Sequence, residues 1–297
     1  MSAAGMRAAS SPGGRLRRLL AGPGPLVLPG CSDALTARLA VRAGFEAVYA
    51  TGAGIANALL GLPDVGLTTM TEMVDQVARI ASAVDVPVVA DIDTGFGNAL
   101  NARRAVVEVE RAGAAAVQIE DQVFPKRCGH FDGKEVVPLS EMLAKIRAAQ
   151  DARRDPALVI IARTDALAVD GFEAAVERGR AFAGAGADLV FVEAPGTLEQ
   201  LAALPGLIPA PLVANMVEGG RTPLASAAEL GAMGYRVVLF ANTALRAGAL
   251  AVRDALAELR ATGDSRGLAD RLLSWEDRQD LVGLPEIEAL EMRYRVD

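Results

Sequence analysis

The chain has 297 residues, of which 52% are hydrophobic and 23% are charged, so it is long and apolar enough to bury a large core. A single α/β barrel commonly occupies about 250 residues, so this length does not require two domains. The net charge of -7 at pH 7 argues against nucleic-acid binding, which needs clustered positive charge. It does not argue against an anionic substrate, because a bound metal ion supplies positive charge locally.

The cysteines and the hydropathy pattern indicate neither secretion nor membrane insertion. Cys31 and Cys128 are the only two cysteines, which is no disulfide framework and favours a reducing, cytoplasmic setting. No apolar run approaches the roughly 20 residues that a membrane-spanning helix needs.

The N-terminal segment 1–24 differs in composition from the rest of the chain. It is rich in Ala, Ser, Gly, Pro and Arg and has no acidic residue. A transit peptide has this composition, but we favour a tail that leads into a short helix over Arg15–Leu20.

Short apolar runs then recur along the chain. Most are rich in Val and Ile without polar alternation, as expected for parallel strands that are buried on both faces. The predicted strands are Leu26–Pro29, Ala47–Ala50, Pro87–Asp91, Ala115–Ile119, Leu158–Ala162, Leu189–Val192, Pro211–Ala214 and Val237–Phe240.

The segments between these runs have helical periodicity. Ala99–Ala112 and Leu139–Ala149 place apolar residues at the i, i+3/4, i+7 spacing of an amphipathic helix. Capping boxes, which mark helix starts, are predicted at Thr69 with Glu72, Asp170 with Glu173, and Thr197 with Gln200.

Eight strand–helix units without a break in composition predict an α/β fold, a closed (β/α)8 TIM-type barrel over residues 25–262. The alternative is an open, doubly wound sheet, but no G-x-G-x-x-G follows the first strand, which weakens the dinucleotide-binding version. Helices over Ala241–Ala261, Ser265–Arg278 and Pro285–Tyr294 are expected next. The extension 263–297 would cover its own barrel or exchange with a neighbouring subunit.

Polar residues end several of the predicted strands, and these ends form the active-site face of an α/β barrel. Neighbouring carboxylates would repel one another without a cation, so Asp91, Asp93 and Glu120 predict a Mg2+ site, with Mn2+ as the alternative. Any one of them read alone is equally compatible with a helix cap or a loop charge. Arg163 would either pair with these acids or clamp a substrate carboxylate. Other strand-end residues are Glu193 and Asn215, with Asp121 and Asp165 assigned structural roles.

A second group of reactive residues lies in the segment 122–137, which is longer than an ordinary βα loop. It contains Lys126-Arg127-Cys128-Gly129-His130, with the only histidine of the chain. Cationic neighbours favour the thiolate form of a cysteine, which suits proton transfer or nucleophilic attack. The alternative is a surface loop with incidental charges; zinc is disfavoured because the soft ligands are too few.

Two glycine-containing strand ends offer backbone amides to an anion. Thr51-Gly52-Ala53-Gly54 follows the second strand, and Gly219-Gly220-Arg221-Thr222 follows the seventh. Glycine is also a common turn residue, so this signal is weak by itself.

These motifs together resemble the isocitrate lyase and phosphoenolpyruvate mutase superfamily, over about Leu26 to Tyr294. The Lys-Arg-Cys-Gly-His loop is similar to that of 2-methylisocitrate lyases, dimethylmalate lyases and oxaloacetate hydrolases, and a carboxyphosphonate-type phosphonomutase branch shares it. The other motifs are Tyr49-Ala-Thr-Gly-Ala-Gly, Leu60-Gly-Leu-Pro-Asp64, Ala90-Asp-Ile-Asp-Thr-Gly-Phe-Gly97, Ile119-Glu-Asp-Gln122, Ile161-Ala-Arg-Thr-Asp165 and Val192-Glu-Ala194.

The resemblance implies a homotetramer, a dimer of dimers in which the eighth helix is swapped between subunits. It implies Mg2+ at Asp91, with Asp93 and Glu120 acting directly or through water and Asp64 nearby. Substrate carboxylates would bind Arg163 and the Thr51-Gly52-Ala53 backbone, with Glu193 and Asn215 as further substrate contacts. A mobile loop around Cys128 would close over the substrate.

The implied reaction is the retro-aldol cleavage of a small 2-hydroxy di- or tricarboxylate to pyruvate or glyoxylate plus a carboxylic acid. Tyr49 is the candidate base and Cys128 the candidate proton donor, with Lys126, Arg127 and His130 supporting the thiol. Lyases acting on isocitrate and methylisocitrate commonly have Ser-Gly-Gly where this chain has Thr51-Gly52-Ala53, so the substrate stays open. The alternatives are an oxaloacetate hydrolase, a phosphonomutase acting on a P–C bond, and a metabolite-binding barrel without turnover.

Overall fold

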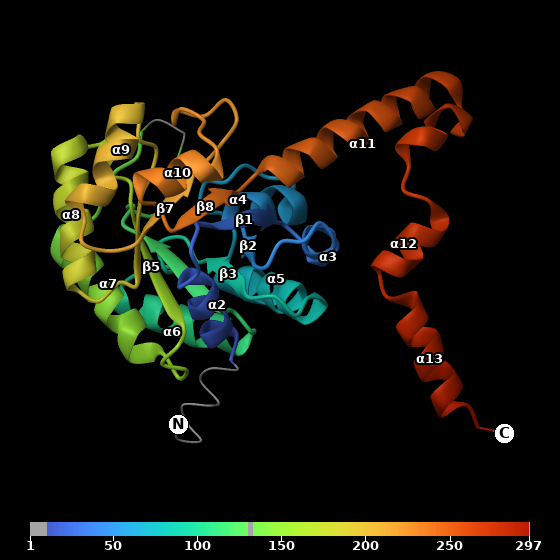
Figure 1. Cartoon of the computed structure of the whole chain (residues 1–297), viewed down its shortest axis with the longest axis horizontal. Helices are drawn as coiled ribbons and strands as arrows, with labels where there is room; N and C mark the ends of the chain where they lie inside the picture. Colours follow the sequence, from blue (N-terminus) through green and yellow to red (C-terminus); the bar gives the residue numbers. More distant parts are fainter. Residues whose placement is uncertain (1–10, 130–132, 297) are drawn as a thin grey trace.

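The computed structural model describes residues 11–129 and 133–296. Eight parallel strands form a closed barrel in which each strand pairs with the next and β8 pairs with β1 (Figure 1). The strands are β1 (Leu26–Cys31), β2 (Val48–Ala50), β3 (Val88–Asp91), β4 (Ala116–Glu120), β5 (Val159–Thr164), β6 (Leu189–Val192), β7 (Leu212–Asn215) and β8 (Val237–Phe240). The predicted TIM-type barrel is confirmed, and the open sheet is excluded.

Helices pack around the outside of this barrel (Figure 1). Those between strands are α3 (Ala34–Arg42), α4 (Gly52–Ile55), α5 (Met70–Ala83), α6 (Ala99–Arg111), α7 (Leu139–Ala152), α8 (Phe172–Gly184), α9 (Leu198–Leu207) and α10 (Ala227–Met233). Before the barrel lies α2 (Pro12–Leu20), and after it come α11 (Thr243–Thr262), α12 (Trp275–Leu281) and α13 (Leu284–Tyr294).

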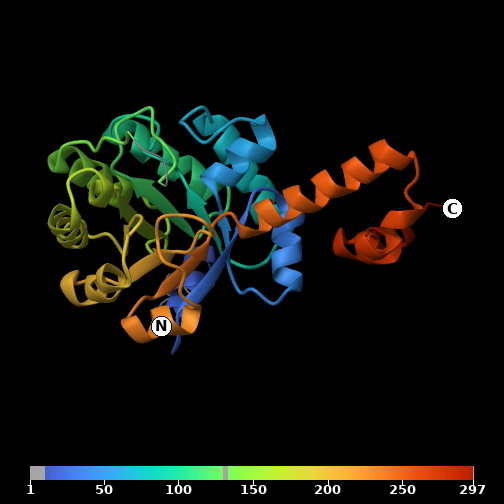
Figure 2. The ribbon, with the colours of Figure 1, turned by 90° about the horizontal axis from the view of Figure 1, so that it is seen from above.

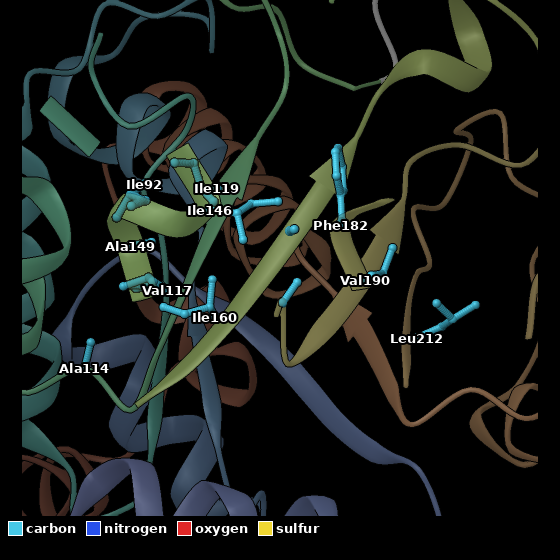
Figure 3. Close-up of a cluster of buried hydrophobic side chains, with 14 of the residues drawn as sticks. Ile92, Ala114, Val117, Ile119, Ile146, Ala149, Ile160, Phe182, Val190 and Leu212 are labelled. Carbon is cyan, nitrogen blue, oxygen red and sulfur yellow. The ribbon is translucent and has the colours of Figure 1, made fainter. Parts of the chain in front are cut away.

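The hydrophobic core has two layers because each strand buries both faces. One layer fills the barrel and includes Leu28, Val89 and Phe191. The other lies between strands and helices, and Figure 3 shows part of it around Ile160 of β5 and Phe182 of α8. This double burial explains why the strands read as continuous apolar runs.

All eight predicted strands are confirmed, but several extend further than predicted. β4 and β5 include Glu120 and Thr164, and β7 ends at Asn215, because parallel pairing continues into the polar residues. In this register Glu120 lies opposite Arg163. The strand ends therefore hold site residues on rigid backbone.

The helix signals were confirmed in part. The capping box of Thr69 and Glu72 is present, whereas the one at Asp170 is wrong because Gly171, with φ of 93°, precedes α8. Thr197 caps α9, but the Gln200 side chain accepts from Gly196 instead of completing the box.

The predicted helix over Ser265–Arg278 was also wrong as a single element. A 3-10 helix over Arg266–Arg271 ends before Ser274, whose hydroxyl caps a separate helix, α12. A new N-cap interrupts the helix because its side chain takes the backbone amide of Asp277.

The C-terminal helices extend away from the barrel (Figures 1 and 2). No residue of α11 is buried, and its exposed apolar side chains include Leu250 and Leu256. Beyond it, α12 reaches α3 through an ion pair between Asp280 and Arg42 at 3.0 Å. Helix exchange between subunits stays a prediction. In the described part of the chain, no helix combines the length and apolarity needed to cross a bilayer.

The N-terminal helix α2 closes one end of the barrel rather than standing apart as a tail. Leu16 is 2% exposed and packs with barrel-interior residues such as Leu28 and Val159. Arg17 donates to the carbonyl of Ala157 and pairs with Asp188 at 2.8 Å. The position of the helix is therefore set by apolar burial and by polar contacts with the loops that lead into β5 and β6.

We expect Leu16→Ala to lower the free energy of unfolding by about 2–5 kcal/mol, because it leaves a cavity in a packed layer. Urea denaturation measures this. Leu100→Ala, at a side chain that is 74% exposed, is the matched control and should change stability by less than about 0.5 kcal/mol. Equal stability of the two variants would show that α2 does not pack on the barrel.

Candidate active site

A small cavity opens at the C-terminal ends of the strands. Its lining comes from β2, β3, β5, β6, β7 and β8 and from the loop after β4, so residues far apart in sequence meet there. The lining residues are Tyr49, Thr51, Ala53, Asp64, Asp91, Lys126, Cys128, Gly129, Arg163, Phe191, Glu193, Asn215, Val217, Leu239, Ala241 and Asn242.

The wall at β3 and β4 is strongly acidic. Asp64, Asp91, Asp93 and Glu120 are all at least nine-tenths buried. Burial, followed by the neighbouring charge of Asp93, raises the pKa of Asp91 to about 6. Burial likewise raises the pKa of Glu120 and of Asp64. These carboxylates are costly when ionised together, so the site favours a cation.

Asp91 is held by its surroundings in one orientation. One oxygen accepts from the Asp93 amide at 3.1 Å and from Gln118 at 3.4 Å, and the other accepts from the Gly52 amide at 3.3 Å. Asp93 itself has φ of 48°, a left-handed conformation that aspartate tolerates better than most residues. The backbone turn after β3 thus directs two carboxylates to one place.

Lys126 supplies one cation to this wall. Its ammonium lies 2.5 Å from Asp64 and 2.8 Å from Asp93, and the side chain is 4% exposed. Burial opposes its charge, but the surrounding carboxylates, Asp93 foremost, hold its pKa well above the usual value. Lys126 belongs to the loop after β4, so this ion pair ties the loop to β3.

The residues present fit a hard divalent cation. The donors are carboxylate oxygens, and Glu120 Oε1 is buried without a hydrogen-bond partner in the described chain. Among the described residues, no three acidic, histidine or cysteine side chains converge closely enough to hold a metal by themselves. This matches Mg2+, which commonly takes one or two carboxylates and completes its shell with water and substrate. The assignment of Asp64, Asp91, Asp93 and Glu120 as metal ligands remains a prediction.

Arg163 supplies the second cation, at the end of β5. Its guanidinium makes two hydrogen bonds to Asp165, at 2.9 and 3.1 Å, and lies 3.3 Å from both Glu120 and Glu193. The guanidinium also lies over the ring of Phe191, 5.2 Å from its centroid. Pairing with acids, one of the two roles predicted for Arg163, is therefore present in the structure.

Asp121 and Asp165 have the structural contacts expected of them. Asp121 accepts from Thr164 and Arg178, and Asp165 also binds Lys134 at 2.7 Å. Burial opposes the charge of Asp165, but Arg163 and Lys134 lower its pKa to about 2. Asp165 is thus a fixed anion that orients Arg163.

The loop after β4 folds over the cavity. The Gln122 side chain makes two hydrogen bonds of 2.8 Å to the Arg127 backbone, and the Cys128 amide donates to the Asp64 carbonyl. Lys134, which the sequence did not single out, donates to the Gly129 carbonyl at 2.6 Å. Cys128 therefore faces the cavity, and its position depends on contacts from both ends of the loop.

Arg127, another predicted residue of this loop, is not among the residues that line the cavity. Its side chain is exposed, and its backbone is held by Gln122. His130 lies outside the described residues.

The predicted anion-binding turn after β2 lies at the cavity. Thr51 accepts from the Gly54 amide and so begins α4, and Ala53 lines the cavity. The Gly52 amide is engaged by Asp91. Burial, followed by the charge of Asp91, raises the pKa of Tyr49 well above its usual value, so this phenol holds its proton firmly.

Sequence reasoning missed several cavity residues on the side of β6 to β8. Phe191, Leu239 and Ala241 resemble ordinary strand residues in the sequence, and the signal that could have found them is their place at or near strand ends. Asn242 could have been found in the same way, because it follows β8 as Asn215 ends β7.

Known relatives match nearly the whole chain. The family model described as phosphoenolpyruvate phosphomutase matches residues 16–260. The chain is 45% identical to a 2,3-dimethylmalate lyase of Eubacterium barkeri, covering 94% of this chain and 97% of that protein. It is 44% identical to a 2-methylisocitrate lyase of Aeropyrum pernix, covering 93% and 89%.

Several solved structures have the same fold as this chain over nearly its whole length. Oxaloacetate acetylhydrolase in complex with the inhibitor 3,3-difluorooxalacetate has a TM-score of 0.91 at 36% identity, covering 95% of this chain and 96% of that one. A phosphonopyruvate hydrolase in complex with oxalate and Mg2+ has a TM-score of 0.86 at 34% identity, covering 96% and 99%.

The packing of Gly129 allows a test of the loop position. A Cβ at Gly129 would lie 2.5 Å from Arg163 Nη2 and 2.6 Å from Glu193 Cδ, so Gly129→Ala should displace the loop. We expect alkylation of Cys128 by iodoacetamide to become several-fold faster. Gly184→Ala, where a Cβ would meet nothing within 4 Å, is the control and should leave the rate unchanged. An unchanged rate in Gly129→Ala would contradict the observed packing.

Proposed function

This chain belongs to the PEP mutase/isocitrate lyase superfamily, and we propose that it is a Mg2+-dependent carbon–carbon lyase acting on a small 2-hydroxy di- or tricarboxylate of the 2,3-dimethylmalate or 2-methylisocitrate type. The products would be pyruvate, or glyoxylate, and a carboxylic acid. The observation that carries the proposal is that Cys128 and the buried acidic wall around Asp91 line the same cavity.

We assign metal binding to Asp91, Asp93, Glu120 and Asp64. Bound there, Mg2+ would lower the pKa of the substrate's 2-hydroxyl and stabilise the oxo acid that forms. The raised pKa of Asp91 and the unpartnered oxygen of Glu120 support this assignment, because a divalent cation would relieve both. Mn2+ would meet the same oxygen donors.

Two residues of the chain would move protons. Tyr49 would take the hydroxyl proton as a phenolate, and a cation bound beside Asp91 would favour that form by offsetting the acidic charges that, after burial, raise the pKa of Tyr49. Cleavage leaves the bond's electron pair on the departing acid as an enolate-like dianion, and Cys128 would donate a proton to that carbon. Lys126, with Arg127 and His130 in the same loop, would offset negative charge and support the thiol. The closed loop would keep water from the intermediate.

The remaining site residues would bind the substrate. Arg163 faces the cavity with its guanidinium fixed by Asp165, which lowers the entropy lost when a carboxylate binds. The turn Thr51-Gly52-Ala53 would meet a second anionic group with the Ala53 amide as the donor, because the Thr51 and Gly52 amides already donate to Cys31 and Asp91. Glu193 and Asn215 line the opposite side of the cavity.

The same site is compatible with two other reactions of this superfamily. One is hydrolysis of oxaloacetate, favoured by the similarity to oxaloacetate acetylhydrolase. The other is chemistry at a P–C bond, favoured by the phosphomutase family model. Only products distinguish them.

We expect turnover of 2,3-dimethylmalate or 2-methylisocitrate with Mg2+ and none with EDTA, read by NMR as pyruvate formation. The panel should also contain isocitrate, oxaloacetate and phosphonopyruvate. Glyoxylate formed from isocitrate would keep the protein a carbon–carbon lyase but would make isocitrate its substrate. Oxalate plus acetate, or a shifted phosphorus signal, would replace it by one of the alternatives, and activity that survives EDTA would contradict the metal assignment.

Cys128→Ser should lower kcat by at least about 10²-fold, because a hydroxyl is a much weaker proton donor at this position. KM should change little, since the variant keeps the hydrogen bond from the residue 128 amide to the Asp64 carbonyl. Cys31→Ser, at a fully buried cysteine in the core layer between strands and helices, is the matched control for thiol loss. Near-normal turnover in Cys128→Ser would refute the role as proton donor.

We also propose a homotetramer built from helix-swapped dimers, in a reducing, cytoplasmic setting. The exposed apolar side chains of α11 and α13, such as Leu256 and Ile287, support burial against another subunit. Both cysteines are free thiols, which supports the setting. Light scattering at micromolar concentration should give four times the chain mass, and a monomer would contradict helix exchange.

A further inference from the structure

Asn242 is placed as an N-cap residue but does not cap its helix. It directly precedes α11, and asparagine is among the best helix caps. Its side chain nevertheless makes no capping hydrogen bond. The start of α11 is held instead by Glu218, which accepts from Thr243 at 2.6 Å. The Asn242 carboxamide is therefore free for another task.

That carboxamide lines the cavity. Its Oδ1 atom is buried and has no hydrogen-bond partner in the described chain, and the same is true of Asn215 Oδ1 at the end of β7. β7 and β8 are neighbours, with Asn215 opposite Leu239. Buried polar atoms normally have partners, so two unsatisfied carboxamides at one cavity indicate a polar ligand.

The ring order of the strands places this pair across the mouth from the acidic wall. In an eight-stranded closed barrel, β7 lies opposite β3, and β8 lies opposite β4. Asp91 and Glu120 end β3 and β4. A substrate whose hydroxyl and adjacent carboxylate occupy the acidic side therefore extends its other half toward Asn215 and Asn242.

We propose that Asn242, together with Asn215, binds the carboxylate on the departing half of the substrate and selects for acids that carry one there. This inference rests on the proposed function and names a residue that recognises its substrate. A carboxamide is neutral, and with its amide turned over Nδ2 takes the place of the unpartnered Oδ1, so it donates N–H to a carboxylate without adding a charge to balance. Leu239 and Ala241 beside it leave room for apolar substituents rather than for a second charge.

The selectivity follows from the same unsatisfied groups. A ligand that lacks the second carboxylate would leave the carboxamides buried and unpaired, and sites built around hydrogen bonds discriminate strongly against such ligands. An apolar residue at position 242 would remove this discrimination, and an aspartate there would repel the carboxylate.

The test uses the full-length protein with Mg2+ and two probes in isothermal titration calorimetry. Oxalate probes the acidic side, and succinate probes the need for a distant carboxylate. We expect Asn242→Leu to raise the Kd of succinate at least 10-fold and the Kd of oxalate less than 2-fold. Asn242→Asp should raise the Kd of succinate further. The proposal is supported if the variants lose affinity for succinate while they keep their affinity for oxalate.

Asn98→Ala provides the matched control, because Asn98 does cap its helix, α6, through hydrogen bonds to Leu100 and Asn101. Asn98→Ala should lower the urea midpoint and keep both Kd values, whereas Asn242→Ala should keep the midpoint and weaken succinate alone. Unchanged succinate affinity in the Asn242 variants, equal loss of both probes, or no succinate binding to the unmodified protein would each overturn the proposal. If oxalate itself fails to bind with Mg2+, the proposed function fails instead.

Discussion

The burial of acidic side chains at one end of the barrel is the constraint on which the rest of the site depends. Asp64, Asp91, Asp93, Glu120 and Glu193 are all buried there, and carboxylates removed from water at close range are costly to ionise. Two cations from the chain offset part of this charge, Lys126 against Asp64 and Asp93, and Arg163 against Glu120 and Glu193. Despite these two cations, burial, followed by the charge of Asp93, raises the pKa of Asp91.

This charge balance links the loop after β4 to the metal end of the cavity. Lys126 reaches Asp93 from the loop that lies over the cavity, and Cys128 is two residues further along the same loop. Lys134 adds a second link, because it joins the Gly129 carbonyl to Asp165, the acid that orients Arg163. The position of the thiol is thus coupled to the arrangement of charges rather than to hydrophobic packing.

The opposite side of the cavity has a different character. From β7 to β8 the lining is formed by Asn215, Val217, Leu239, Ala241 and Asn242, so it combines apolar surface with neutral hydrogen-bonding groups. One face of the cavity thus suits a cation and the chelating part of a substrate, and the other suits the part that differs between substrates. This division is in keeping with relatives of similar sequence or fold that are named for different acids.

The sequence by itself determined the barrel and the acidic wall. Strands buried on both faces must be apolar throughout, so Val88–Ala90 or Val190–Val192 are visible as runs, and Asp91 and Glu120 stand out where those runs end. Only the tertiary structure decided the partners of each charge. Lys134 meets Asp165 and Arg17 meets Asp188 across long sequence separations, which no local pattern encodes. It also decided that Asn242 turns away from its helix, because a cap and a cavity residue have the same sequence signature and differ only in which neighbours the fold brings near.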